Sequence, residues 1–144
     1  MGKNNEKNDG KNLNNNINER IMAGLRASRP KFPQRAIVTA GMPYGNKELH
    51  FGHIGGMIVH ADTYARFLRD RIGSDNVIFV SGTDCYGSPI VAAYNKLVED
   101  GKFSGRIEDF VEKNHNSQKE TLKRYGVEMN LFGASGLYKT GEIH

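Results

Sequence analysis

The chain has 144 residues, with 20 Lys and Arg against 16 Asp and Glu and a formal net charge of +4, and this length allows about one ordinary domain. No window approaches the roughly 18 consecutive apolar residues of a membrane span, and the N-terminus leads into polar sequence, so neither membrane insertion nor export is expected. The single cysteine, Cys85, can form no internal disulfide and no structural zinc site, which predicts a reducing, cytoplasmic setting.

The excess positive charge lies in the first part of the chain, because residues 1–33 hold seven Lys and Arg and three Asp and Glu. Residues 34–144 are balanced and present no electrostatic footprint for a polyanion on their own. Up to about Arg20 the sequence is dominated by Asn and Lys, with too little apolar surface to offset the entropy of ordering. This leader is either an unstructured tail of no specific function or a basic arm that touches RNA.

Prolines mark the start of the folded part. Residues 21–26 have the composition of a helical turn or two, which Pro30 and Pro33 stop. We therefore predict a disordered, Asn/Lys-rich leader over residues 1–33 and a folded domain over residues 34–144.

A strand, a helix and a second strand follow. Residues 35–40 are a short apolar, β-branched run of the kind found in buried parallel strands, and residues 76–82 repeat it. Between them, spacings of three and four predict an amphipathic helix that ends near Gly73, with the apolar residues Ile54, Met57, Ile58, Ala61, Ala65 and Leu68. Its outward side is expected to carry Asp62, Arg66, Arg69 and Asp70. This is a βαβ unit with a right-handed crossover.

Two more helices are predicted, over residues 88–99 and 107–125. The second has acids in its first turn and an apolar stripe that includes Ile107, Phe110, Val111, His115 and Leu122. Residues 127–144 show a mixed pattern with no clear closing element. The fold class is therefore α/β, with a parallel sheet.

The loop between the first strand and the helix, residues 41–53, carries the chemistry. In an open parallel sheet, ligands bind beyond the carboxyl ends of the strands, where the next helix presents unpaired N–H groups and its positive dipole end to an anion. Gly52 lets a phosphate approach the backbone, and His50 and His53, one helical turn apart, can both donate hydrogen bonds to it. The pattern favours a nucleotide polyphosphate.

Two other interpretations of the histidines stay open. The first is a metal site of His50, His53 and His60, but the turn offers no acidic residue at ligand spacing and no Cys partner, so no metal is predicted. The second is a purely structural pair that caps the helix.

The run Met42-Pro43-Tyr44-Gly45-Asn46, followed after three residues by His50-Phe51-Gly52-His53, resembles the first signature of the class I aminoacyl-tRNA synthetases, and most of all the methionyl-tRNA synthetases. The likeness continues through residues 61–66 and 79–89 and fades after Gly133. It covers about residues 36–144. The resemblance implies the N-terminal half of a Rossmann-type nucleotide-binding fold.

The resemblance also implies a role for each matching residue. In such enzymes the two signature histidines stabilise the ATP phosphates while the amino-acid carboxylate attacks the α-phosphorus, so His50 and His53 would be catalytic through charge stabilisation. Mg²⁺ would accompany the ATP. The residues implied to contact ATP are Tyr44, Asn46, His50, Gly52 and His53, and those implied to contact methionine are Gly41, Met42, Tyr44 and Asp84. A cap before the turn at residues 87–89 is the alternative role of Asp84.

The chain departs from the family pattern at Cys85 and at Lys47-Glu48, which replace residues of other types without removing the implied contacts. It contains no match to the second signature, Lys-Met-Ser-Lys-Ser, and none to the connective and anticodon-binding domains. The resemblance thus implies a methionine–tRNA ligase that joins methionine to tRNA through methionyl-adenylate, present as an incomplete catalytic domain. We expect the isolated chain to bind ATP weakly or not at all and to show no turnover.

Two alternative functions stay open at this point. One is a stand-alone nucleotidyltransferase of the His-x-Gly-His type, although residues 40–44 lack the Gly-Thr-Phe-Asp-like turn that normally precedes the motif. The other is a non-catalytic remnant that binds a missing half, either a second polypeptide or a C-terminal remainder with the lysine signature. The sequence does not distinguish methionine from other aliphatic amino acids, nor a natural chain from a truncated one.

Overall fold

A computed structural model of the chain describes residues 15–24 and 31–138. The chain divides into two units, Met1–Phe32 and Pro33–His144. In the first unit, residues 15–24 form a helix with exposed side chains, which begins earlier than the helical turn predicted at residues 21–26. The rest of the predicted leader, up to residue 30, lies outside the described residues, so its disorder stays a prediction.

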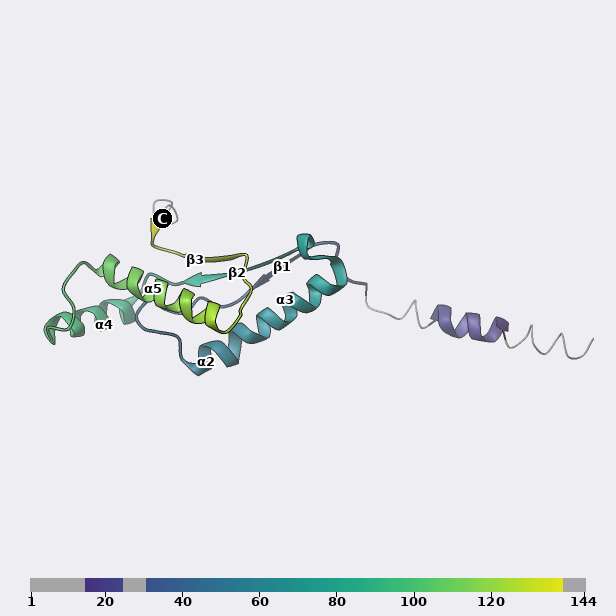
Figure 1. The fold of residues 1–144 in the computed structure, drawn as a ribbon, viewed down its shortest axis with the longest axis horizontal. Coiled ribbons are helices and arrows are strands. Elements are labelled where there is room, and N and C mark those ends of the chain that lie inside the picture. The colour runs from purple at the N-terminus through teal and green to yellow at the C-terminus, as the bar shows by residue number, and fades with distance from the viewer. Residues whose placement is uncertain (1–14, 25–30, 139–144) are drawn as a thin grey trace, which may run out of the picture. The chain divides into compact units, whose positions relative to one another are not determined.

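The second unit is built on a three-stranded parallel sheet in the order β1-β2-β3 (Figure 1). The strands are β1 (Ala36–Thr39), β2 (Val77–Thr83) and β3 (Leu131–Ala134). The strands predicted at residues 35–40 and 76–82 are confirmed. The third strand was missed, because its four residues show neither alternation nor a β-branched run.

One continuous helical run follows the first strand and its loop. It comprises α2 (Phe51–His53), a π-helical turn η1 (Ile54–Ile58) and α3 (Val59–Ile72). It stops at Gly73, whose φ of 91° lies in the left-handed region that favours glycine, as the sequence predicts. A short 3₁₀ turn, η2 (Ser74–Asn76), leads into β2.

The two later helices are also confirmed, as α4 (Ser88–Glu99) and α5 (Ile107–Arg124). The helix α4 has proline in its first turn, where no backbone N–H is needed, and α5 has acids in its first turn and bases in its last, which suits the helix dipole.

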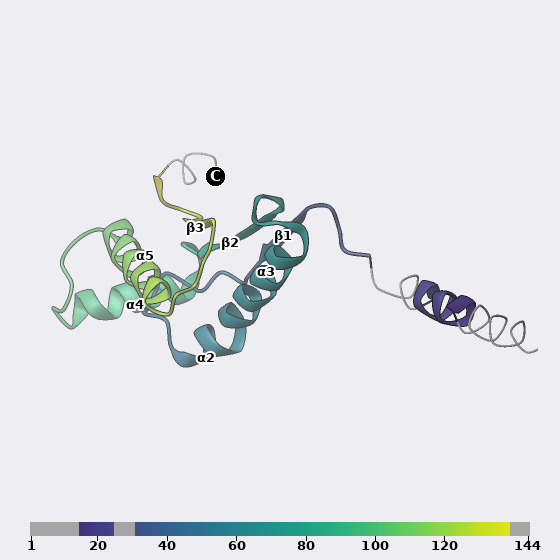
Figure 2. The ribbon, with the colours of Figure 1, turned by 45° about the vertical axis from the view of Figure 1, so that its right-hand side comes forward.

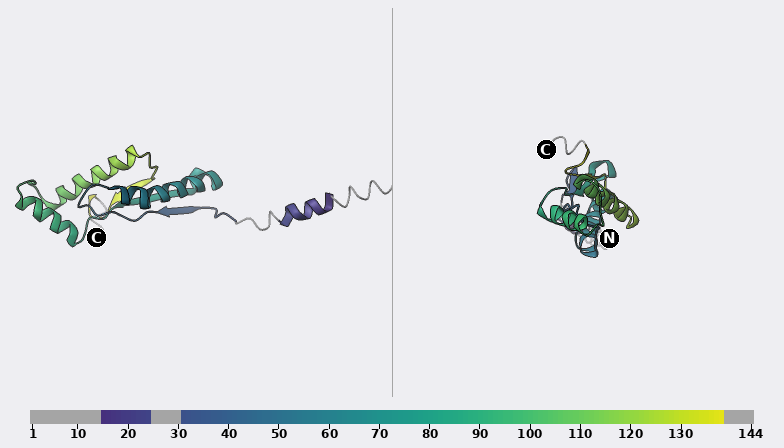
Figure 3. Two further views of the ribbon diagram at one scale, coloured as in Figure 1. Left: turned by 90° about the horizontal axis from the view of Figure 1, so that it is seen from below. Right: turned by 90° about the vertical axis from the view of Figure 1, so that its left-hand side faces the viewer.

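Both α3 and α5 pack on the same face of the sheet. Val38, Val77 and Phe79 of the strands pack with Ala65 and Leu68 of α3 in one core cluster, and Figure 2 shows α3 running along β1 and β2. A second core cluster joins α4, α5 and the end of β3 through Ile90, Phe110, Val111, Ala134 and Leu137. The left panel of Figure 3 shows α3, in teal, and α5, in yellow-green, on one side of the strands.

The opposite face of the sheet is bare. Ile37, Ile78 and Leu131 point to that face, and they are 72%, 47% and 60% exposed. Within residues 31–138, no element therefore covers these side chains. Parallel sheets are normally covered on both faces, so the fold is half of a two-sided α/β arrangement. This confirms the predicted fold class.

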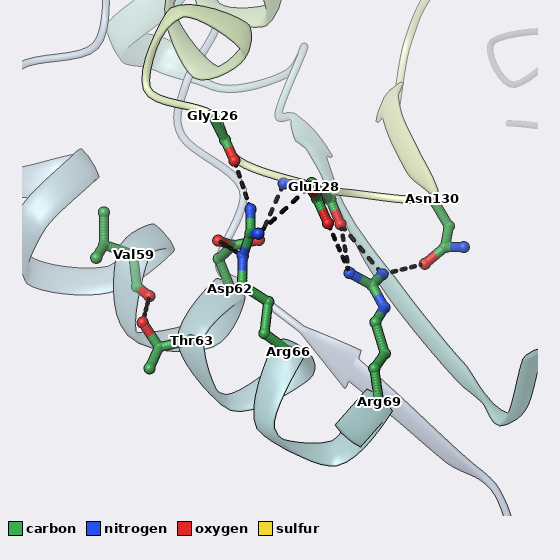
Figure 4. Close-up of polar contacts among 8 residues, drawn as sticks. All are labelled: Val59, Asp62, Thr63, Arg66, Arg69, Gly126, Glu128 and Asn130. Atoms are coloured by element: carbon green, nitrogen blue, oxygen red, sulfur yellow. Dashed lines mark hydrogen bonds and ion pairs between the residues drawn. The ribbon is translucent and has the colours of Figure 1, made fainter. Parts of the chain in front are cut away.

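Of the polar residues predicted on the outward side of α3, Asp70 is exposed and Arg66 and Arg69 are half-buried, and only Asp62 departs fully from the prediction. Asp62 is buried, and it accepts hydrogen bonds from Arg66 Nε at 2.7 Å and from the backbone N–H of Glu128 at 2.9 Å (Figure 4). Arg69 donates to the Glu128 carbonyl and to Asn130 Oδ1. These charged groups of α3 form hydrogen bonds to residues 128–130, the segment just before β3. This explains why α3 carries charge on the side that this segment covers.

Candidate nucleotide site

The loop that follows β1 continues alongside the end of β2. Tyr44 and Asp84 form a parallel bridge, in which the Asp84 N–H donates to the Pro43 carbonyl at 2.9 Å and the Gly45 N–H donates to the Asp84 carbonyl at 2.8 Å. The backbone bonds therefore bring two of the predicted substrate residues, 40 positions apart, to the same carboxyl edge of the sheet. This is the edge at which ligands bind in open α/β sheets.

The two signature histidines lie together at the start of the helical run, with ring centroids 3.8 Å apart and planes tilted by 31°. His50 is the N-cap, and its Nδ1 accepts a hydrogen bond from the Gly52 N–H at 3.1 Å. His53 Nδ1 accepts one from the His50 N–H at 3.3 Å. The capping role that the sequence left open is therefore present in the structure.

Capping determines which ring nitrogen remains for a ligand. Because Nδ1 of each ring accepts a backbone hydrogen bond, each neutral ring carries its proton on Nε2. Burial lowers the pKa of His53, and the nearby His50 and Lys47 lower it further, so this ring is neutral at pH 7. Among residues 31–138 neither Nε2–H has a hydrogen-bond acceptor, so the capping and anion-binding roles are compatible.

The His50 ring packs closely against the backbone of Gly52. A Cβ built on Gly52 would meet His50 Cε1 at 3.0 Å and Nδ1 at 3.1 Å, which is tighter than ordinary van der Waals contact. The π-helical turn η1 comes directly after His53, and such turns occur frequently at functional sites. The backbone of this segment is therefore adapted to the positions of the two rings.

The remaining predicted site residues of the loop differ in how far they are buried. Met42 and Tyr44 are each 46% exposed. A Cβ on Gly41 would meet Met57 Sδ at 2.7 Å, so this glycine allows the loop to pack on the helical run. Asn46 is half-buried, and its Oδ1 has no hydrogen-bond partner among the described residues. Asn46 Oδ1 is thus a buried acceptor that lacks a partner in this part of the chain.

Asp84 adopts the capping role that the sequence left as its alternative. Its Oδ1 accepts a hydrogen bond from the Tyr86 N–H at 3.1 Å, which forms a turn ahead of α4. Within residues 31–138 its Oδ2 accepts none. The backbone N–H of the neighbouring Cys85 donates a hydrogen bond to Ser135 Oγ at 2.9 Å.

The sequence missed the side chains that hold the loop. Gln118 of α5, 1% exposed, donates from Nε2 to the carbonyls of Tyr44 and Lys47, at 2.9 Å each. Asn114 Nδ2 donates to the Gly45 carbonyl at 3.0 Å. The position of Gln118 in the sequence could have indicated this role. It lies on the apolar stripe of the helix, between His115 and Leu122, where a polar side chain must find a buried partner.

A cavity, the metal alternative and the membrane question concern other parts of the described chain. A cavity of about 280 Å³ lies between α4, α5 and residues 136–137, and the predicted site residues lie outside its lining. In the described part of the chain, no three His, Cys, Asp or Glu side chains gather as a metal site would require; His60, the third member of the metal alternative, is exposed. Nor does any described helix have the length and apolarity to cross a membrane.

A Rossmann-like α/β half-sheet with a histidine loop at its carboxyl edge is typical of the nucleotide-binding α/β proteins. Comparison with known proteins identifies the family within that class. The sequence profile of the family described as tRNA synthetases class I (M) matches residues 36–141. A methionine–tRNA ligase from Chlamydia pneumoniae is 35% identical over 100 residues, which cover 69% of this chain and 17% of that protein.

Two further methionine–tRNA ligases show the same degree of similarity. The protein from Thermococcus onnurineus is 35% identical over 103 residues, covering 72% of this chain and 13% of its own length. The protein from Cytophaga hutchinsonii is 34% identical over 100 residues, covering 69% and 13%. The chain belongs to the class I tRNA synthetases of the (M) family, and it spans 13–17% of the length of these relatives.

Proposed function

We propose that this chain forms the N-terminal part of the catalytic domain of a methionine–tRNA ligase. The reaction joins methionine and ATP into methionyl-adenylate, releases pyrophosphate, and then transfers the methionyl group to tRNA. The family membership and the similarity to three methionine–tRNA ligases support this assignment. A protein of this kind works in the cytoplasm, where tRNA is charged.

The observation that carries the proposal is the histidine pair. The two rings lie 3.8 Å apart, and their Nδ1 atoms are occupied by backbone N–H groups. The two Nε2–H donors would contact the ATP phosphates, with Mg²⁺ accompanying the ATP, and would stabilise the charge that develops at the α-phosphorus. Preorganised donors of this kind lower a barrier without reorganising during the reaction. Gly52, Tyr44 and Asn46 complete the proposed ATP contacts.

The methionine would lie on the same edge of the sheet. Gly41, Met42 and Tyr44 supply backbone and apolar surface, and Asp84 Oδ2 would accept a hydrogen bond from the substrate ammonium group. The parallel bridge between Tyr44 and Asp84 supports a shared site. The ammonium group would thus be bound next to the residues proposed to contact ATP.

The bare face of the sheet supports a second part of the proposal, that the domain is completed by another polypeptide segment. Exposed Ile37, Ile78 and Leu131 form a surface of the kind that helices cover in parallel α/β sheets. The completing segment is a C-terminal remainder or a second polypeptide, and it would bring the lysine signature and the parts that contact tRNA. The chain alone is then a binding module for its missing half.

A chimaera tests the proposal. Residues 36–138 replace the matching segment of the Thermococcus onnurineus ligase, and methionine-dependent exchange of pyrophosphate into ATP is measured. We expect exchange above background, and a loss of about 100- to 1000-fold in the His50→Asn variant, the usual effect of removing one preorganised donor. Asn is the matched substitution because it keeps an N-cap acceptor and removes the Nε2–H. A folded, inactive chimaera would contradict the proposal.

The isolated chain provides the complementary test. Without the completing segment it should show no methionine-dependent exchange. Exchange by the purified 144-residue chain would show that the site is already complete. Equal exchange with leucine in place of methionine, in the chimaera, would contradict the substrate assignment.

A further inference from the structure

A buried chain of polar groups runs from α5 to the loop that carries the histidines. Thr83 at the end of β2 and His115 and Gln118 of α5 are 0%, 3% and 1% exposed. Their polar atoms are joined at 2.9 Å, between Thr83 Oγ and His115 Nδ1, and at 2.7 Å, between Thr83 Oγ and Gln118 Oε1. Buried polar groups are costly unless paired, so such a group of three requires a reason.

The direction of each hydrogen bond follows from the donors available. Thr83 has one hydroxyl proton, which it donates to Gln118 Oε1, so its oxygen accepts the Nδ1–H of His115. The Gln118 amide is thereby oriented with its oxygen toward Thr83 and its NH₂ toward the loop. Both amide protons are used, one for the carbonyl of Tyr44 and one for that of Lys47.

The two accepting carbonyls, of Tyr44 and Lys47, lie within the segment between the end of β1 and His50. Asn114, one turn earlier on α5, binds the Gly45 carbonyl between them. The loop is thus attached to α5 at the carbonyls of residues 44, 45 and 47, and Ser117 Oγ of the same helix also donates to Glu48 Oε1 at 3.3 Å. Beyond Lys47 only Glu48 and Leu49 precede His50.

We propose that Gln118 is a positioning residue for the histidine pair, acting through the loop carbonyls of Tyr44 and Lys47. This role rests on the proposed function, since the placement of the rings matters for catalysis only if they contact ATP. With Gln118 in place, the loop is held before any ligand arrives. Without its two hydrogen bonds, the loop is held to α5 by fewer hydrogen bonds, those of Asn114 and Ser117, and the two rings no longer keep one mutual arrangement.

Gln118→Met tests the role in the full 144-residue chain, because Met has a similar length and no hydrogen-bonding amide. The matched control is Leu122→Ala, a buried position of the same helix whose apolar side chain can form no hydrogen bond to the loop. Urea unfolding of both variants measures the general loss of stability. Ring contacts between His50 and His53 and solvent exchange of the His50 and Gly52 amides, measured by NMR, report on the loop.

We expect Gln118→Met to remove the ring–ring contacts and to raise exchange of the two amides by about tenfold or more, as the loss of buried hydrogen bonds implies. Leu122→Ala should destabilise the fold and leave both signals as in the wild-type chain under native conditions. Intact ring contacts in a folded Gln118→Met chain, or equal loosening in Leu122→Ala, would overturn the proposal. If Gln118→Met does not fold, Gln118→Glu gives the same test with an isosteric side chain whose carboxylate lacks N–H donors.

The loop signals are independent of ATP, which separates this inference from the proposed function. In the chimaera, Gln118→Met should reduce pyrophosphate exchange mainly through kcat, by about 10- to 100-fold, because the ATP contacts remain and their alignment is lost. An inactive wild-type chimaera with an ordered loop in the free chain would count against the proposed function alone. An active Gln118→Met chimaera with unchanged kcat would count against the positioning role alone.

Discussion

Two groups of polar side chains join parts of this protein that lie far apart in sequence, and they do so in opposite surroundings. The first, the buried triad of Thr83, His115 and Gln118, is almost fully removed from solvent. The second, the α3 cluster of Asp62, Arg66, Arg69 and Glu128, is ionic and partly open, with 42% of the Arg66 side chain and 64% of that of Glu128 exposed. The triad is bonded to the loop of the candidate site through Gln118, whereas the α3 cluster binds the segment that precedes β3.

The difference in burial should decide how much stability is lost when a hydrogen-bond partner is removed. In the triad, the Thr83 hydroxyl joins His115 Nδ1 and Gln118 Oε1, and in this buried place water cannot replace a lost partner. In the α3 cluster, only Asp62 is buried, and the other members can exchange a protein partner for solvent. Substitutions in the triad should therefore cost more than substitutions in the cluster, and salt should affect only the cluster.

The largest effect is expected from Thr83→Val, which keeps the shape and removes the hydroxyl. The Nδ1–H of His115 and the Oε1 of Gln118 would both be left unpaired in the interior, at a cost of about 2–4 kcal/mol in the free energy of unfolding. Urea unfolding measures this loss. Thr83→Ser keeps the hydroxyl and should lose only about 1 kcal/mol for the missing methyl group. Equal losses in the two variants would contradict the importance of the hydroxyl.

Asp62→Asn should cost less, about 1–2 kcal/mol, because the amide keeps an oxygen for the Glu128 N–H and loses the charge that holds Arg66. Urea unfolding again gives the value. The matched control is Asp70→Asn, an exposed acid on the same helix, which should stay within about 0.5 kcal/mol of the wild-type chain. A loss in Asp62→Asn as large as that in Thr83→Val would contradict the ranking.

The pH dependence of stability should report on the triad. Burial lowers the pKa of His115 below the ordinary value of 6.5, with a further lowering by Lys119 and an opposing effect of Glu112. The unfolded chain therefore binds more protons between the two pKa values. The contribution of His115 is complete above pH 6.5 and is lost as the pH falls toward the folded-state pKa, with a slope of at most about 1.4 kcal/mol per pH unit.

Urea unfolding between pH 5 and pH 7.5, at about half-unit steps, measures this slope. The pKa of His53 is shifted in the same direction, so His115→Gln and His53→Gln are compared. The slope should flatten more in His115→Gln, because that ring is the more deeply buried of the two. Stability that rises on acidification through this window would contradict the sign.

The smallest effect belongs to the outer ion pair of the α3 cluster. A double-mutant cycle of Arg66→Gln and Glu128→Gln should give a coupling of about 0.5 kcal/mol, because both side chains are well exposed and Arg66 Nη1 lies 3.3 Å from Glu128 Oε1. Raising the salt to about 0.5 M NaCl should reduce the coupling further. A coupling that salt leaves unchanged would show that the pair is less accessible than its exposure indicates.

Local patterns were sufficient for most of the elements. The apolar runs at residues 35–40 and 76–82 and the three- and four-residue spacings of the helices are repeated in β1, β2, α3, α4 and α5. The histidine pair was also accessible, since residues three apart at the start of a helix lie on one side of it. Its contact with ATP and the methionine contacts of Asp84 stay predictions, which the chimaera tests.

Long-range contacts explain what the patterns missed. The four residues of β3 are a strand because Asn130, just before them, bonds to both the N–H and the carbonyl of Phe79, while Arg69 holds Asn130 in turn. Asp62 was expected on the outer side of its helix, and it is buried where the backbone N–H of Glu128 reaches its carboxylate. Spacing along one helix carries no information about such partners.

The amino-acid order alone was enough to establish the α/β class, the family resemblance and the residues of the signature loop, since all three depend on neighbours within a few positions. The folded arrangement added the third strand, the bare face, the inward side of α3 and the attachment of the loop by Gln118. These features depend on residues 40 to 75 positions apart, which meet only when the sheet and its helices have assembled.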